Sequence, residues 1–97
     1  MEIKSTTEGT RLTIAVSGRV DTVTAPELAD ALKLDDATCV VLDLENVPYM
    51  SSAGIRLLLS AHKTMHAKGG ELKIANVQEA VREVLDITGF LDIFNIV

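Results

Sequence analysis

Apolar residues recur every second position in some segments of this chain and about every 3.6 positions in others. Residues 11–17 alternate strictly, which is typical of a half-buried strand. Residues 2–6 are expected to pair with this strand through a turn near Gly9. Gly18 then ends the predicted strand and opens a loop over residues 19–23. The chain is therefore predicted to begin with a β-hairpin.

A first helix is predicted to start at Thr24. The threonine side chain is a candidate N-cap, Glu27 is placed to reach back and complete a capping box, and Pro26 suits the first turn. Apolar residues then recur at helical spacing until Asp35-Asp36 ends the segment. The spacing predicts one amphipathic helix between the hairpin and the next strand.

Residues 39–44 form an almost continuous aliphatic run that ends the first half of the chain. Such a run is typical of a strand that is covered on both faces, so we expect a central strand in a sheet flanked by helices. The lone Cys39 at its start is interpreted as a small buried core residue rather than a nucleophile.

A long amphipathic helix is predicted after Ser51-Ser52, and Gly69-Gly70 ends it. Its expected inward stripe comprises Ile55, Leu58, Leu59, His62 and Met65. Residues 71–75 read as a short strand, and Asn76 is a candidate cap for a last helix that Gly89 ends. Residues 92–97 are expected to form an edge strand or to dock on the core.

The order of elements is β-β-α-β-α-β-α with a short final strand. Strands that alternate with helices imply an α/β fold with an at least partly parallel sheet. Ninety-seven residues suffice for one domain and are too few for two, so we expect a single domain over residues 1–97.

Composition excludes several classes of function. The net charge of −5 and the absence of a basic run argue against nucleic-acid binding, which depends on Lys and Arg neutralising phosphates. No apolar run reaches the roughly 20 residues of a membrane span, and the first residues lack the pattern of a secretory signal. A single cysteine allows no internal disulfide, so a cytoplasmic location is expected.

No motif in the chain points to catalysis, a metal or a cofactor. His62 and His66 have a spacing that suits zinc, but Lys63 stands where a zinc protease motif carries glutamate. We interpret both histidines as partly solvated helix residues. No glycine-rich phosphate loop and no acid/base pair of carboxylates is found, so the chain is not expected to be an enzyme.

Ser51-Ser52 is the feature with a functional signal, because it lies between a buried strand and a long helix. Open α/β folds place their functional sites at the carboxyl ends of strands. A structural alternative is that the serines merely cap the helix, since serine is among the best N-caps. The residues alone favour the cap, and the following Ala53-Gly54 adds little beyond it.

The chain resembles the STAS family of anti-sigma factor antagonists over practically its whole length. The segments that carry the resemblance are Val16–Asp21 with Thr24-Ala25, Val41–Leu44, Met50–Ile55, Gly69–Asn76 and Leu85–Phe90. The resemblance implies the STAS fold, with a mixed central sheet of four to five strands and three to four helices packed against it.

The resemblance also implies a function for Ser52. In that family the serine at this position is phosphorylated by the partner, an anti-sigma factor that is itself a histidine-kinase-like serine kinase. Dephosphorylated antagonist binds this partner and frees the sigma factor; phosphorylation releases it, and a serine phosphatase resets it. Ser51 stands where better-known members carry aspartate, which makes it a second, less favoured acceptor.

The same resemblance places a partner-binding surface around the serines. Its candidate residues are Asp21, Thr22, Ser51, Ser52, Ala53, Gly54, Ile55 and Arg56. For Asp21, a loop-capping role is an equal alternative. Ile55 is a candidate for either core or interface, whereas Arg56 is expected to be exposed and available to a partner.

Two rival functions stay open from the sequence. One is a STAS domain that scaffolds or senses a small molecule and is never phosphorylated. The other is a small phosphocarrier or transferase subunit, which requires a reactive histidine or cysteine on a loop. Cys39, His62 and His66 all fall in predicted strands or helices, which disfavours the second rival.

Overall fold

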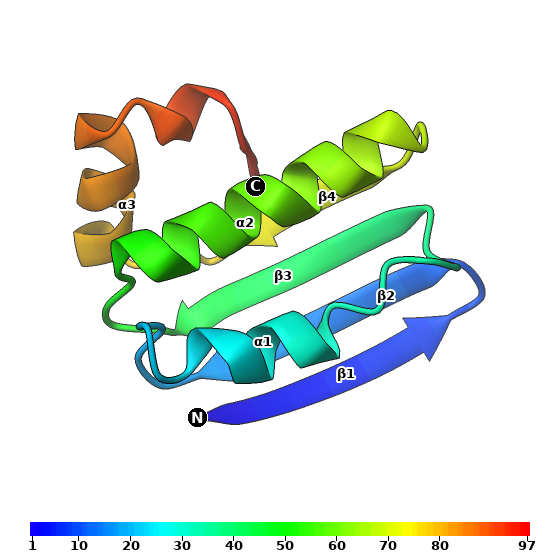
Figure 1. The fold of residues 1–97 in the computed structure, drawn as a ribbon, viewed down its shortest axis with the longest axis horizontal. Helices are drawn as coiled ribbons and strands as arrows, with labels where there is room; N and C mark the ends of the chain where they lie inside the picture. Colours follow the sequence, from blue (N-terminus) through cyan, green and yellow to red (C-terminus); the bar gives the residue numbers. More distant parts are fainter.

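The computed structural model of the protein covers residues 1–97 (Figure 1). Its elements are β1 (Glu2–Glu8), β2 (Arg11–Ser17), α1 (Ala25–Ala31), β3 (Cys39–Asn46), α2 (Ser52–Ala67), β4 (Glu71–Ala75), α3 (Glu79–Ile87), the 3-10 helix η1 (Phe90–Asp92) and β5 (Asn95–Ile96). The five strands form one sheet in the order β1-β2-β3-β4-β5. β1 is antiparallel to β2 and all other neighbours are parallel, which confirms the predicted mixed α/β sheet.

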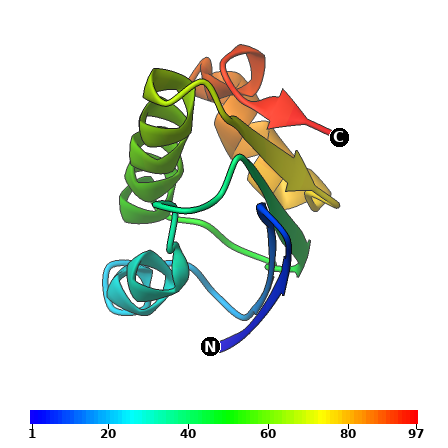
Figure 2. The same cartoon turned by 90° about the vertical axis from the view of Figure 1, so that its right-hand side faces the viewer.

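Helices α1 and α2 cover one face of the sheet, as the edge-on view in Figure 2 shows. On the covered face, every second residue of β2, β3 and β4 is buried in one hydrophobic cluster. In β3 they are Val40, Leu42 and Leu44, each 0 % exposed. Helix α3 lies beyond the carboxyl end of the sheet rather than over its second face (Figure 1).

The prediction that β3 is covered on both faces is therefore wrong. Cys39, Val41 and Asp43 point to the face that carries no helix and are only half-buried. Cys39 is accordingly not a core residue. The aliphatic run led to this wrong prediction because Val41 needs no covering helix. Its side chain lies in a row with Thr13 and Lys73 of the neighbouring strands, which shield it from solvent.

Both predicted helix caps also differ from the structure. Thr24 makes no side-chain cap to α1, and Glu27 completes no capping box. Helix α3 begins after Gln78 instead of Asn76. Asn76 instead adopts a left-handed conformation with φ 56°, and its Nδ2 donates to Asp43 Oδ1 at 3.1 Å. The side chains of Thr24 and Asn76 thus form hydrogen bonds with loop or distant residues rather than with the backbone amides of the helix that follows.

The predictions of a turn at Gly9 and of a final edge strand are confirmed, and the predicted inward stripe of α2 is confirmed in part. Gly9 takes a positive φ of 60° in the tight turn between β1 and β2, where glycine carries no steric penalty. The chain ends in an edge strand, β5, parallel to β4. The buried stripe of α2 includes Ile55, Leu58 and Met65, but Ala61 takes the place expected for Leu59 and His62, which are half-buried. No helix is both long enough and apolar enough to cross a bilayer.

Candidate functional site

Two loops at the carboxyl edge of the sheet are joined by backbone hydrogen bonds. Val20, in the loop after β2, forms a parallel bridge with Met50, in the loop after β3. The Val20 amide donates to the Tyr49 carbonyl at 3.0 Å, and the Ser51 amide donates to the Val20 carbonyl at 2.8 Å. Val20 and Met50 are 0 % and 2 % exposed. The start of α2 is thus fixed to the loop that contains Asp21.

The two serines at the start of α2 differ in accessibility. Ser51 is the N-cap, with extended backbone angles, and its carbonyl accepts the Ile55 amide at 3.0 Å. Its Oγ is buried and has no hydrogen-bond partner. Ser52 is the first helical residue and its side chain is exposed. Of the two serines, only Ser52 is exposed at the surface.

Gly54 and Ile55 hold the first turn of α2 against the joined loops. Both residues are buried, which assigns Ile55 to the core. A Cβ on Gly54 would lie 2.6 Å from Met50 Cγ and 2.7 Å from Val20 Cγ1, closer than non-bonded carbons approach. Glycine is therefore required for the helix to sit this close to the loops, and these two residues position the serines.

Asp21 caps the entry to α1. Its Oδ1 accepts from the backbone amides of Val23 and Thr24, both at 3.0 Å. In return, the Asp21 amide donates to Thr24 Oγ1 at 2.9 Å. The side chains of Asp21 and Thr24 therefore each accept a hydrogen bond from the backbone amide of the other residue. Of the two roles considered for Asp21, the structure shows the capping one, which closes the loop that lies beside Ser51.

These hydrogen bonds set the charge state of Asp21. The Thr24 amide is the main cause that lowers the pKa of the carboxyl below its usual value of 3.8. Burial opposes this effect, while the Val23 amide, the Thr24 hydroxyl and the positive charge of Arg19 add to it. The guanidinium Nε of Arg19 lies 4.0 Å from Asp21 Oδ2.

The Asp21→Asn variant is expected to be less stable than the wild type at pH 7, with a difference that shrinks in acid. A carboxyl whose pKa is lowered by folding stabilises the native state above its unfolded pKa, and loses that contribution as pH falls through the folded pKa. Melting temperatures between pH 7 and pH 3 should therefore converge below about pH 4. Asp30→Asn, at an exposed position of α1, is the control. A gap for Asp21→Asn that stays constant with pH would contradict the assignment.

Arg19 and Tyr49 form an exposed pair that sequence reasoning missed. The Arg19 guanidinium carbon lies 4.4 Å from the centroid of the Tyr49 ring, within the range of a cation–π contact. Tyr49 is 42 % exposed and the nearby Val23 is 81 % exposed. The signal available in the sequence was the only tyrosine, three residues before Ser52. We call Arg19, Val23, Tyr49 and Ser52 the carboxyl-edge surface.

A shallow groove runs between α1 and α2 beside Ser52. It has a volume of about 370 Å³ and is lined by Thr22, Ala25, Pro26, Ala29, Ala53, Arg56, Leu57 and Ser60. Thr22 and Arg56 are exposed, as expected for residues available to a partner, and Ala53 is half-buried. The structure therefore brings Thr22, Ala53 and Arg56 together on the helix-covered side of the molecule.

The two histidines lie away from this site, on α2. His62 packs edge-on against Phe94, with ring centroids 5.8 Å apart, and stacks on His66 at 6.1 Å. His62 is half-buried and His66 is exposed. No group of three or more metal-ligating side chains is present, so the pair lacks the third ligand that protein zinc sites require.

Comparison with known proteins agrees with this architecture. The family model of the STAS domain matches residues 2–97. The anti-sigma-B factor antagonist of Staphylococcus aureus is 30% identical over 99 residues, which cover 99% of this chain and 92% of that protein.

Solved structures show the same fold. An anti-sigma factor antagonist from Mycobacterium paratuberculosis superposes with a TM-score of 0.85 at 24% identity, covering 98% of this chain and 83% of that one. The phosphorylated form of the Bacillus cell fate determinant SpoIIAA superposes with a TM-score of 0.76 at 17% identity, covering 99% and 91%. The chain thus belongs to the STAS domain family, among the anti-sigma factor antagonists, which are regulators and not enzymes.

Proposed function

We propose that this protein binds an anti-sigma factor in its unphosphorylated form and is released when that partner phosphorylates Ser52. The observation that carries the proposal is the exposed Ser52 side chain at the start of α2, next to a buried Ser51 hydroxyl. The relative named as an anti-sigma-B factor antagonist supports the partner class. The SpoIIAA structure in a phosphorylated form supports the type of modification.

In the proposed reaction this chain supplies only the acceptor. The Ser52 Oγ attacks the γ-phosphorus of ATP bound to the kinase, the bond from that phosphorus to ADP breaks, and the hydroxyl proton passes to a base of the kinase. A serine phosphatase hydrolyses the ester and restores the hydroxyl. The cycle takes place in the cytoplasm, where the sigma factor meets RNA polymerase.

The position of Ser52 suits a switch that changes binding without unfolding the protein. A phosphate adds roughly −1.5 to −2 charges. The first turn of α2 contains no acidic residue, and free backbone amides and the helix dipole favour an anion there. The same charge weakens binding of a partner that docks over Ser52, because the phosphate must then be desolvated.

The carboxyl-edge surface supports the docking part of the proposal. Tyrosine and arginine are enriched among the side chains that anchor protein interfaces, and here Arg19 and Tyr49 form an exposed pair in the loops that precede α1 and α2. Val23 adds an exposed aliphatic side chain at the same edge. Thr22, Ala53 and Arg56 continue this surface along the groove between α1 and α2.

The direct test is intact-mass spectrometry after incubation with the candidate anti-sigma kinase and Mg-ATP. We expect one phosphate on the wild type and on Ser51→Ala, and none on Ser52→Ala, because only the Ser52 hydroxyl is accessible. Loss of the phosphate in Ser51→Ala, with the phosphate retained in Ser52→Ala, would show that Ser51 is the acceptor and would contradict the proposal. An unmodified wild type, with a kinase that binds and hydrolyses ATP, would favour the scaffold or sensor function.

A further inference from the structure

Arg56 lies one helical turn after Ser52 and has no acidic partner. The ion pairs of the structure are Arg19–Asp21 and Lys73–Glu71, so no carboxylate lies within 4.0 Å of the Arg56 guanidinium. The nearest helix, α1, carries Glu27 and Asp30, but these line the cavity on its other side, toward β1. Arg56 is thus an unpaired, exposed cation on the side of the groove.

The start of α2 is electrostatically unbalanced in the unphosphorylated protein. The amino end of a helix carries a partial positive charge, and the first turn of α2 has no acidic residue to match it. Arg56, the fifth helical residue, adds a full positive charge close to the same end. The carboxylate of Asp21, in the adjoining loop, is already engaged by two backbone amides and by Arg19, so an anion at Ser52 would compensate both positive charges.

We propose that Arg56 is the internal counter-charge for a phosphate on Ser52, an inference that rests on the proposed function. Residues four apart on a helix have Cβ atoms about 5–6 Å from each other, and an anion that precedes the cation has the favourable orientation. The guanidinium donates two parallel N–H groups to phosphate oxygens in the geometry that makes such pairs strong. Phosphorylation therefore stabilises α2 while it blocks the partner.

The same geometry discriminates between the two serines. The residue four positions after Ser51 is Ile55, which is buried in the core and offers no charge. A phosphate on Ser51 would also have to leave the buried position of the Ser51 Oγ. The pair with Arg56 thus forms only from Ser52, and it makes the phosphate a dianion at a lower pH than an isolated phosphoserine.

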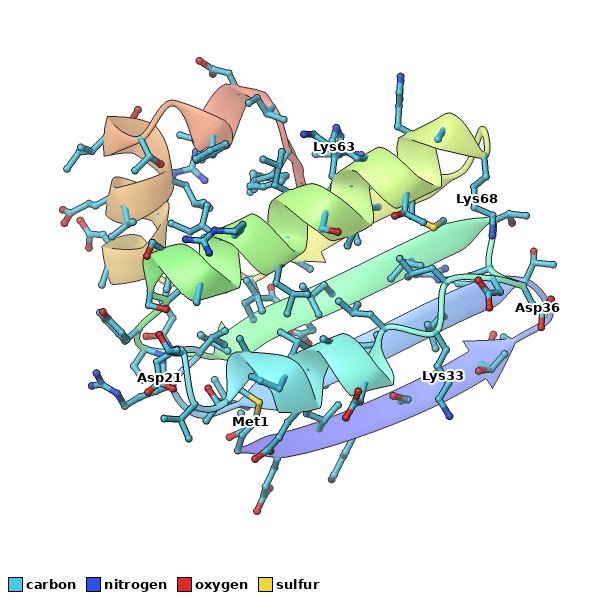
Figure 3. All side chains as sticks on the ribbon, in the orientation of Figure 1. Met1, Asp21, Lys33, Asp36, Lys63 and Lys68 are labelled. Atoms are coloured by element: carbon cyan, nitrogen blue, oxygen red, sulfur yellow. The ribbon has the colours of Figure 1, made fainter.

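The test uses protein that carries phosphoserine at position 52 by genetic encoding, so that no kinase is needed. A ³¹P NMR titration is expected to give a second phosphate pKa about 0.2 to 0.4 unit lower in the otherwise wild-type protein than in Arg56→Gln. The control is Lys63→Gln, which removes the same charge from α2 at a position about 16 Å from Ser52 along the helix, beyond the screening length. Figure 3 shows Lys63 on the same helix, well away from its start. Equal pKa values for Arg56→Gln and the wild type would overturn the inference.

A double-mutant cycle on melting temperature gives a second readout. Ser52→Glu is expected to raise the melting temperature by about 1 to 3 °C more when Arg56 is present than in Arg56→Gln, and 1 M salt should remove the difference. Additive effects would contradict the pair. Neither readout depends on a kinase, so failure of the mass-spectrometric assay would count against the proposed function alone.

Discussion

Ser52→Glu is expected to weaken binding of the anti-sigma factor by about 30-fold to 4,000-fold, because a docked partner must desolvate the new carboxylate together with Arg56, at a cost of about 2–5 kcal/mol. Ser52 is exposed and directly precedes Ala53, which lines the groove between α1 and α2. The fold should survive, since a carboxylate at the first position of a helix interacts favourably with the dipole.

Isothermal titration calorimetry with the purified anti-sigma factor measures this loss. Ser52→Gln is the matched control, because glutamine has the size of glutamate without its charge, and it should lose much less affinity. Melting temperatures of the free variants must stay within a few degrees of the wild type. A Ser52→Glu protein that binds normally would refute the charge mechanism, and one that melts far lower would show that the anion disturbs its own domain.

Gly54→Val is expected to destabilise the free protein by about 3 kcal/mol, since added carbon atoms in a packed core force side chains and backbone to shift. For a domain of this size that corresponds to a melting temperature lower by about 12 to 24 °C. The cause is local: even the first added carbon would lie within 2.7 Å of both Met50 Cγ and Val20 Cγ1. Circular dichroism against temperature measures the effect.

The mechanism is checked by a graded series. Gly54→Ala should lose less, because alanine adds one carbon and regains up to about 1 kcal/mol of helix propensity relative to glycine. Combining Gly54→Ala with Val20→Ala removes the closest methyl group, so the double variant should recover part of what the two single changes lose. Fully additive losses would show that the contact with Val20 is not the reason that glycine is needed.

Both predictions concern the way in which the first turn of α2 is held in place. The backbone bridge between Val20 and Met50 and the absent side chain of Gly54 hold the first turn of α2 in one place. Ser52 thereby lies on a helix rather than in a loop, and we expect a change of its charge to alter the surface and not the fold. The accessible serine and the packed glycine two residues later are complementary parts of the same turn.

Local patterns in the sequence determined most of the fold. The two-residue alternation of residues 11–17, the helical spacing after Ser52 and the glycines at turns correctly predicted the order of strands and helices. This succeeds because the side-chain periods of strands and helices are properties of the local backbone, and burial selects apolar residues at those periods. The resemblance to the STAS family, which the comparisons confirm, followed from the same ordered segments.

Only the tertiary structure decided which residues of the site are buried, exposed or paired. The bridge from Val20 to Met50 joins positions 30 residues apart, and it is this contact that lies beside the buried Ser51 hydroxyl while Ser52 stays exposed. The second face of β3 is open because α3 docks at the end of the sheet, a choice that no pattern within β3 encodes. Burial of a side chain depends on what packs over it, and residues distant in sequence supply that cover.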